Sequence, residues 1–347
     1  MKLVSFRNKQ YPERLGLHLE GQILDLQASA KNMNISLPSN MKEFLENWDE
    51  NLDLAREVKM AYLDGKLTKP EIVTGASLLA PVPHPSSCRD AYAFRQHVAA
   101  ARKSRGLEMP PEYDQYPVFY YTNHTAIIGP GEVLVEKDHL HRLDFELELA
   151  VVIGKRGKNI AGEKADSYVA GFTIMNDFSA RQLQAEEMLL NLGPAKGKDF
   201  ATAVGPWLVT TDELEKFRIQ TDFGDKYDLK MIARHNGKSV SEGNSKDMNW
   251  TFAEIIERCS YGVEILPGDV IGSGTVGTGC YLELNGTRAR EAKARGEEYK
   301  PVWLQAGDTI ELEITGLEKL QNTIVRAPGE HSILARKKIL QPQANLK

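Results

Sequence analysis

Long apolar runs and a strong net charge are both missing from this sequence of 347 residues. No apolar stretch approaches the roughly 20 residues that a transmembrane helix needs, and the first residues contain no signal-peptide core. We therefore expect a cytoplasmic protein with no membrane partner. The formal net charge of −5 and the sequence pI of about 6.0 argue against a nucleic-acid partner.

Cysteine is also scarce, because the chain has only Cys88, Cys259 and Cys280. These residues are widely spaced and odd in number, which fits a reducing cytosol and indicates neither a disulfide framework nor a zinc site. The hydrophobic content of 41% and the charged content of 26% are those of an ordinary soluble globular protein. The length allows two domains.

The most informative stretch is residues 143–154, where acidic and apolar residues alternate and an apolar run follows. Asp144, Glu146 and Glu148 share one parity, which predicts a strand with two unlike faces, and the apolar run predicts that this strand enters a core. Carboxylates carried into a core repel each other and lose hydration. A hard divalent cation compensates for both effects, since Mg²⁺ and Ca²⁺ bind carboxylate oxygens. A solvated acidic edge strand is the alternative, and the apolar run argues against it.

Proline marks the division of the chain into two parts. Three prolines at alternate positions within residues 81–85 hold an extended segment. We predict a small β-rich domain over 1–80, with helical periodicity over 41–63, and a larger domain over 81–347.

Residues 90–105 read as one helix, with an acid at its start and basic residues in its last turn. Asp90, Phe94 and His97 would then share one face. A helix-capping aspartate and a structural histidine are the alternative interpretations, and the shared face makes both residues candidates for a site.

A predicted buried strand over 168–175 runs into a helical pattern. Asp177 lies at the junction, in the position of an N-cap, and Arg181 and Gln184 follow on the same helical face. The alternative is a simple cap with an ion pair. A strand-to-helix junction also suits a site residue, because the backbone is rigid on both sides.

A glycine loop over 272–277 matches the pattern G-x-G-x-x-G. A dinucleotide fingerprint needs a following helix, and residues 280–284 read as a strand, so we reject that interpretation. The loop instead allows backbone to approach a small ligand. Residues 288–300 read as a solvated charged loop, and the acids of the alternating stretch 308–314 read as surface residues.

Five segments in this order resemble the fumarylacetoacetate hydrolase family. They are D-x-Y-x-x-R-Q-H (90–97), DFELE (144–148), NDFSARQLQ (176–184), GKDF (197–200) and GSGT (272–275), the last followed by LEL (282–284). The resemblance implies a mainly β fold of the α+β class, a mixed β roll preceded by a small SH3-like β domain, and a homodimer.

The resemblance also implies a role for each matched side chain. One divalent cation, Mg²⁺ or Ca²⁺, is bound by four carboxylates, those of Asp90, Glu146, Glu148 and Asp177. His97 is the general base and Glu283 orients it, whereas Asp144 is given a structural role. The residues that bind or polarise the substrate are Lys198, Arg181, Gln184, Tyr92, Tyr120 and Thr275.

The activity expected from this set is hydrolysis of a carbon–carbon bond in a 1,3-diketo acid such as fumarylacetoacetate or an acylpyruvate, in the catabolism of aromatic compounds. The R-Q-H stretch favours hydrolysis, because water attack on a ketone needs a base such as His97. A β-keto-acid decarboxylase, tautomerase or 2-keto-acid hydratase on the same metal is the alternative. A non-catalytic metal- or ligand-binding protein is an alternative of another class.

Overall fold

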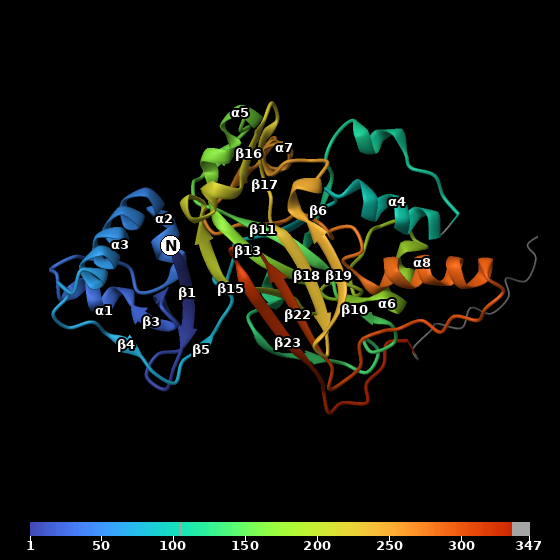
Figure 1. Cartoon of the computed structure of the whole chain (residues 1–347), viewed down its shortest axis with the longest axis horizontal. Coiled ribbons are helices and arrows are strands. Elements are labelled where there is room, and N and C mark those ends of the chain that lie inside the picture. Colours follow the sequence, from blue (N-terminus) through green and yellow to red (C-terminus); the bar gives the residue numbers. More distant parts are fainter. Residues whose placement is uncertain (105, 335–347) are drawn as a thin grey trace, which may run out of the picture.

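The computed structural model in Figure 1 describes residues 1–104 and 106–334. The last residue of the predicted helix 90–105 and the end of the predicted second domain, residues 335–347, lie outside the described residues. Two large sheets dominate the described chain, and helices lie around them. This architecture confirms the expected mainly β fold of the α+β class. Among the described helices, none is long and apolar enough to cross a bilayer.

The larger sheet contains twelve strands. In chain order they are β1 (Lys2–Arg7), β2 (Arg14–Leu19), β3 (Gln22–Asp25), β4 (Ile72–Val73), β5 (Ser77–Leu78), β6 (Cys88–Ala91), β7 (Phe119–Thr122), β8 (Ile127–Ile128), β11 (Leu147–Ile153), β13 (Val169–Asp177), β15 (Thr202–Thr210) and β21 (Val270–Gly272). Their order in space is β4-β3-β2-β1-β15-β13-β11-β21-β6-β7, while β5 pairs with β1 and β8 pairs with β15. Strand β11, which contains the apolar half of the stretch 143–154, is therefore central.

A second sheet of five strands covers one face of the first (Figure 1). Its strands, in spatial order, are β19 (Lys238–Asn244), β18 (Lys230–His235), β22 (Thr309–Ile314), β23 (Glu318–Arg326) and β9 (Gly131–Val135). Three two-stranded ribbons complete the β-structure of residues 1–104 and 106–334: β10 (Leu143–Asp144) with β14 (Ser179–Ala180), β12 (Gly157–Lys158) with β20 (Glu264–Ile265), and β16 (Arg218–Thr221) with β17 (Gly224–Tyr227).

Strand β11 is buried on both faces, as its apolar run predicts. Side chains at alternate positions, from Leu147 to Ile153, join a core shared with the five-stranded sheet. Ala150 and Val152 point the other way, into a second core shared with the N-terminal helices. Glu148 has the parity of this second set, so its carboxylate is carried into the interior of the protein.

The N-terminal part contains three helices besides its strands, α1 (Leu26–Lys31), α2 (Met41–Glu46) and α3 (Trp48–Leu63). The helical pattern predicted over 41–63 is confirmed, with an interruption at Asn47. Strand β1 pairs antiparallel with β15, so the N-terminal strands extend the large sheet. The division at residue 80 therefore remains a prediction.

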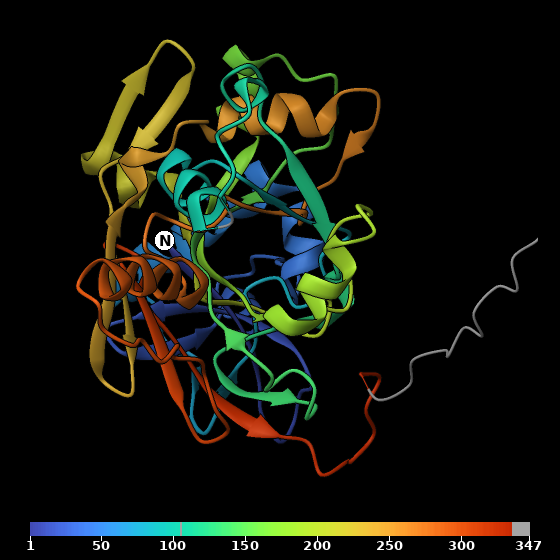
Figure 2. The same cartoon turned by 90° about the vertical axis from the view of Figure 1, so that its right-hand side faces the viewer.

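Five further helices lie in the rest of the chain as far as the structure describes it. They are α4 (Arg95–Ser104), α5 (Gly162–Ala165), α6 (Arg181–Met188), α7 (Phe252–Ser260) and α8 (Tyr281–Ala294). The short 3₁₀ segments are η1 (Pro111–Asp114), η2 (His124–Ala126), η3 (Asp166–Tyr168), η4 (Thr211–Phe217) and η5 (Ser245–Asp247). Figure 2 views the molecule from the side on which α4, α6 and α8 lie. These three helices position much of the candidate site.

The strand predicted over 280–284 is wrong, because α8 begins at Tyr281 and continues to Ala294, through half of the predicted loop 288–300. The cause is distant in sequence. The carboxylate of Asp144 accepts hydrogen bonds from the backbone N–H groups of Tyr281 and Leu282, at 2.7 and 2.9 Å. Asp144 thus satisfies the first turn of α8, a contact that the sequence did not predict, because it predicted a strand there and gave Asp144 no more than a general structural role.

Two predicted positions on helices are also wrong. Asp90 lies on β6 rather than at the start of a helix, because β6 pairs with β21 and places Asp90 beside Gly272. Helix α4 begins only at Arg95. Asp177 is the last residue of β13 rather than an N-cap, and α6 begins at Arg181.

Candidate active site

Four carboxylates converge between the strands of the large sheet. One oxygen of each lies within 4.8 Å of the others, and all four side chains are buried: Asp90, Glu146, Glu148 and Asp177. They come from β6, from the break between β10 and β11, from β11 and from the end of β13. The structure therefore brings together the four acids for which the sequence predicts metal binding.

Backbone groups hold this acidic cluster in place. The Asn176 side chain accepts a hydrogen bond from the Glu146 N–H at 3.0 Å, which fixes the break before β11. The N–H of Gly274 donates to Asp90 at 3.0 Å. A Cβ atom on Gly272 would lie 2.6 Å from Asp90 Oδ1 and 2.8 Å from Glu148 Oε2. Only glycine leaves room for both acids there, so the glycine loop lies against the cluster itself.

This contact supplies a better reason to reject a dinucleotide site. A helix, α8, does follow the glycine loop, so the reason drawn from the sequence fails. The backbone of the loop faces the carboxylates of Asp90 and Glu148 instead, and these would repel a pyrophosphate.

Burial and mutual repulsion disfavour the charged forms of the acids in the cluster. Burial, and then the neighbouring Asp177, raise the pKa of Asp90 to about 8. Burial and the nearby Asp90 raise the pKa of Glu148 well above its usual range. Glu148 Oε2 and Asp177 Oδ1 are buried without a hydrogen-bond partner. Unpartnered carboxylate oxygens are the ligands that a hard divalent cation takes, so this donor set fits Mg²⁺, Ca²⁺ or Mn²⁺.

Two buried basic side chains offset part of this negative charge. Lys198 Nζ forms ion pairs with Glu146 and with Asp177, the latter at 2.7 Å. Arg181 bridges Glu146 and Asp144, with nitrogen–oxygen distances of 2.7 and 2.8 Å. Burial raises the pKa of Glu146, but Lys198 and Arg181 outweigh it and hold that pKa below its usual range. The four acids of the cluster and Asp144 outnumber these two basic side chains. A divalent ion would offset negative charge that Lys198 and Arg181 leave.

A histidine–carboxylate pair lies at the edge of the cluster. His97 Nδ1, on α4, lies 2.9 Å from Glu283 Oε2, on α8, and both side chains are buried. Glu283 Oε2 also accepts a hydrogen bond from the Thr278 N–H at 2.9 Å. Helices α4 and α8 pack side by side, as Figures 1 and 2 show. This packing brings together the pair that the sequence predicts as base and orienting acid.

The remaining predicted residues also gather here. Tyr120 donates its hydroxyl hydrogen bond to Asp177, and Gln184 Oε1 accepts from Arg181 Nη1 at 3.0 Å. Thr275 Oγ1 lies 3.5 Å from Glu148, and the Tyr92 ring meets the His97 ring edge-to-face at 5.9 Å between centroids. Their proposed roles toward a substrate remain predictions.

Sequence reasoning missed two residues of this region. Asn176 received no role, although it stands directly before Asp177 in a matched motif. The second is Cys280, whose Sγ lies within 4.8 Å of a ring nitrogen of His97 and of a carboxylate oxygen of Glu146. No spacing signal could have revealed this proximity, because His97 and Cys280 come together only through the packing of α4 against the start of α8.

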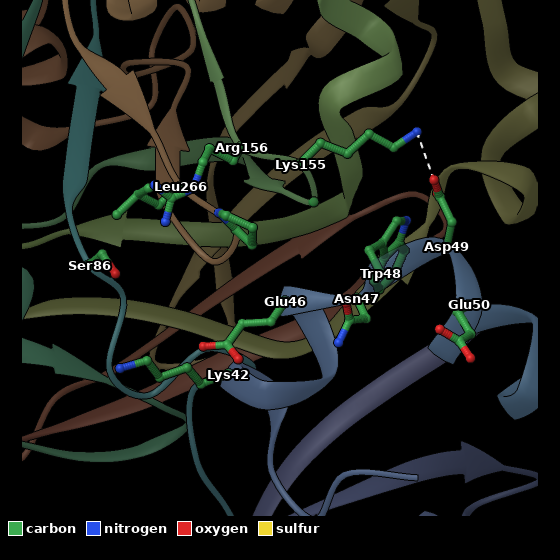
Figure 3. A pocket seen from close by; sticks show the side chains of 12 residues that line it. Lys42, Glu46, Asn47, Trp48, Asp49, Glu50, Ser86, Lys155, Arg156 and Leu266 are labelled. Atoms are coloured by element: carbon green, nitrogen blue, oxygen red, sulfur yellow. Dashed lines mark ion pairs between the residues drawn. The ribbon is translucent and has the colours of Figure 1, made fainter. Parts of the chain in front are cut away.

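A separate pocket lies at the other end of β11. Its volume is about 730 Å³, and it opens between the start of α3 and the turn that follows β11 (Figure 3). Lys155 and Asp49 form an ion pair of 3.0 Å there. Its lining contains none of the predicted site residues. We therefore assign the chemistry to the acidic cluster and not to this pocket.

Residues 87–325 match the family model described as the C-terminal domain of fumarylacetoacetate (FAA) hydrolase. The chain belongs to the fumarylacetoacetate hydrolase family. The match begins just before β6 and ends in β23, so it includes every residue of the acidic cluster and of the histidine–carboxylate pair. It also confirms the resemblance drawn from the five sequence segments.

Named relatives extend this family assignment. The chain is 31% identical over 338 residues to "Oxaloacetate tautomerase FAHD2A, mitochondrial" from Homo sapiens, which covers 94% of this chain and 92% of the relative. Among solved structures, a fumarylacetoacetate hydrolase from Exiguobacterium antarcticum is 24% identical with a TM-score of 0.66, over 94% of this chain and all of that one. Maleylpyruvate hydrolase from Sphingobium sp. SYK-6, in complex with manganese(II) and pyruvate, is 22% identical with a TM-score of 0.65, over 94% of this chain and 99% of that one. The two solved structures establish that the fold is that of the family.

Proposed function

We propose that this chain is a divalent-metal-dependent enzyme that interconverts the keto and enol forms of a β-keto acid of the oxaloacetate type. The observation that carries the proposal is the buried pair of His97 and Glu283 beside four convergent carboxylates. The substrate class is supported by the similarity to a relative named as an oxaloacetate tautomerase. Hydrolysis, which the sequence favoured, therefore becomes the second candidate.

The acidic cluster would hold the metal and, through it, the substrate. Asp90, Glu146, Glu148 and Asp177 would supply the oxygen ligands. A divalent cation bound there polarises the carbonyl oxygens of a keto acid as a Lewis acid, which acidifies the adjacent C–H group.

His97 would move the proton. Its Nδ1 faces the Glu283 carboxylate, so the ring proton is held there and Nε2 carries the free lone pair. Nε2 takes a proton from the carbon between the two carbonyl groups and returns it to the enolate oxygen, so the proton count is unchanged over the turnover. Glu283 stabilises the imidazolium that exists between the two transfers.

Lys198 and Arg181 would offset charge during this transfer. Lys198 is buried between Glu146 and Asp177, and burial opposes its charge while these acids raise the pKa of its ammonium group. It therefore stays protonated and can face a substrate carboxylate or the enolate oxygen. Arg181 holds Glu146 in place, and Gln184 accepts a hydrogen bond from Arg181 in turn.

Carbon–carbon hydrolysis of a 1,3-diketo acid remains the second candidate. The same pair of His97 and Glu283 could deprotonate a water molecule instead of a carbon, and a solved relative is named a maleylpyruvate hydrolase. Decarboxylation, hydration and simple ligand binding would use the same cluster without requiring this buried pair.

A substrate panel tests the proposal. Enol oxaloacetate, an acylpyruvate, fumarylacetoacetate and a 2-keto-4-pentenoate are each followed by the loss of enol or diketone absorbance, with Mg²⁺, Ca²⁺ or Mn²⁺ and after chelation. We expect metal-dependent ketonisation of oxaloacetate to be the fastest reaction. Faster cleavage of a diketo acid would replace the proposal by the hydrolase. Tight binding of these acids with no turnover of any would replace it by a binding protein.

The identity of the metal follows from the same panel. The four carboxylates suit Mg²⁺, Ca²⁺ and Mn²⁺ alike, and the Mn²⁺ in a solved relative supports adding Mn²⁺ to the two ions expected from the sequence. Stabilisation against heat by each ion, in the absence of substrate, ranks their affinities.

We also propose a homodimer. The last residue of α6 and the segment that follows it expose four apolar side chains: Met188, Leu189, Leu190 and Leu192. Leu192 is 94% exposed, a surface that a second copy could cover. Light scattering should give a dimer for the wild-type chain and a smaller particle for a variant with Leu189→Asp and Leu192→Asp. An unchanged mass in that variant would place the interface elsewhere.

The cytoplasmic location and the role in the catabolism of aromatic compounds remain predictions. The human relative is named as a mitochondrial protein. Fractionation of the producing cells, followed by detection of the chain, tests the location.

A further inference from the structure

We propose a second cation site beside the acidic cluster, formed by His97, Glu146 and Cys280, for a divalent ion that accepts sulfur and nitrogen ligands, such as Zn²⁺. One ligand atom of each residue lies within 4.8 Å of those of the other two, and all three residues are buried. Imidazole nitrogen, carboxylate oxygen and thiolate sulfur are the three donors found at zinc sites. Three protein ligands leave a fourth position of a tetrahedral ion open.

The surroundings of His97 match those of a zinc-ligating histidine. Such a histidine donates its other ring N–H to a carboxylate, which fixes the ring and raises its basicity. Glu283 lies 2.9 Å from His97 Nδ1 and so leaves Nε2 for a ligand. The pair proposed above as base and orienting acid is, in the same geometry, a pair able to hold zinc.

The ligand chemistry separates this site from the acidic cluster. The cluster offers oxygen donors alone, which suits hard cations, whereas the new site adds sulfur and nitrogen, which hard cations avoid. Glu146 belongs to both groups, and its two oxygens also pair with Arg181 and Lys198. Among the described residues, Cys88 and Cys259 fall in no such group, although both are buried. The position of Cys280 is therefore specific among the three thiols.

Occupation of this site would inhibit the proposed function. A cation on Nε2 of His97 removes the lone pair that the proposed proton transfer needs. Binding also replaces the proton of the Cys280 thiol by the metal ion, so one proton is released to solvent for each ion bound, and no oxidant or reductant takes part. The inhibition is then reversible by a chelator.

Cd²⁺ is a suitable probe, because cadmium–thiolate bonds absorb in the ultraviolet whereas carboxylate complexes do not. The whole chain is first saturated with Mg²⁺, so that the acidic cluster is filled, and is then titrated with Cd²⁺. We expect one cadmium–thiolate band that saturates at one equivalent. The band should be absent in Cys280→Ser and unchanged in the matched control Cys259→Ser. A missing band in the wild-type chain, or an equal band in Cys280→Ser, overturns the proposal.

A second variant excludes misfolding as the cause of a lost band. Glu283→Gln leaves the thiol in place and should weaken Cd²⁺ binding about 10- to 100-fold, because the partner of His97 is changed. Unaltered Cd²⁺ affinity in a folded Glu283→Gln chain would exclude His97 as a ligand and refute the site. Circular dichroism melting of each variant, with Mg²⁺ present, establishes that it is folded.

The site rests on the proposed function only for its inhibitory effect. The two proposals have separate readouts. The cadmium–thiolate band tests the second cation site even if the chain shows no turnover, and turnover with Mg²⁺ tests the proposed function even if no band forms. Zn²⁺ should abolish turnover of the wild-type chain, a chelator followed by Mg²⁺ should restore it, and Cys280→Ser should resist Zn²⁺. Equal sensitivity of the wild-type chain and Cys280→Ser to Zn²⁺ would contradict the assignment of Cys280.

Discussion

The Glu283 carboxylate lies 2.9 Å from Nδ1 of His97, although 186 positions separate the two residues in the chain. Both are buried, and Glu283 is itself held by the Thr278 N–H. A carboxylate in this place fixes the orientation and the tautomer of the imidazole. The role of the histidine can therefore be tested from its partner as well as from the ring.

Glu283→Gln should lower kcat for the best substrate by about 10²-fold, because the amide cannot stabilise the imidazolium formed during proton transfer. KM and the affinity for Mg²⁺ should change little, since the four metal-binding acids are intact. Steady-state kinetics and a metal titration check both points. Unchanged kcat would mean that His97 does not act with Glu283.

His97→Ala should abolish turnover while metal binding survives, because the proposed ligands of the metal are the four carboxylates and not His97. Turnover and heat stabilisation by Mg²⁺ are measured on the same preparation. Full turnover in this variant would exclude His97 as the base and would favour a reaction in which the metal alone is sufficient.

The acidic cluster shows how far sequence reasoning could go. Burial of Glu146 and Glu148 was predictable, because an apolar run follows them directly and carries them into the core. Their convergence with Asp90 and Asp177 was suggested by family motifs, while the secondary structure around those two acids was predicted wrongly. Asp90 reads as helical from its neighbours, but pairing of β6 with β21 makes it a strand residue. The pattern of neighbouring residues carries no information about a partner strand that lies far along the chain, so it could not predict this pairing.

The start of α8 illustrates the same limit from another side. Residues 280–284 alternate like a strand, and a local pattern of five residues cannot be told from a helix start. The deciding contact is made by Asp144, whose carboxylate accepts hydrogen bonds from the N–H groups of Tyr281 and Leu282. The proximity of Cys280 to His97 follows from this capped helix start, so it was beyond prediction as well.

Glu148→Gln should remove the heat stabilisation that Mg²⁺ gives, because one of four ligands is lost. For the wild-type chain this stabilisation is about 2.7 kcal/mol at a concentration one hundred times Kd. The metal-free variant should be at least as stable as the metal-free wild type, since Glu148 is buried beside Asp90 and one of its oxygens has no partner. Calorimetry with and without Mg²⁺ tests both statements. Retained stabilisation by Mg²⁺ would show that Glu148 is not a ligand.

The stability of the metal-free protein should fall as the pH rises from about 4 to about 8. The pKa of Asp90 is raised from 3.8 to about 8, by burial first and then by Asp177. Between these two values the folded chain holds a proton that the unfolded chain has released, so the free energy of unfolding decreases with pH. Saturating Mg²⁺ should flatten this slope, because the bound ion displaces the proton.

Urea unfolding across this pH range, with and without Mg²⁺, measures the effect. Asp90→Asn is the control, since it removes the titrating group and should reduce the slope of the metal-free chain. A metal-free stability that increases with pH over the same range would contradict the raised pKa of Asp90.

Arg181→Met should cost about 3–5 kcal/mol of unfolding free energy, because it leaves Asp144 and Glu146 buried without their shared cation. The matched control is Arg234→Met. Arg234 also bridges two acids, but its side chain is 26% exposed, so its loss should cost about 1 kcal/mol or less. Urea unfolding of both variants, free of metal and at one pH, compares the two costs. Equal losses would mean that water reaches the Arg181 pair, and the acidic cluster would then lack the dry surroundings on which its proposed metal affinity depends.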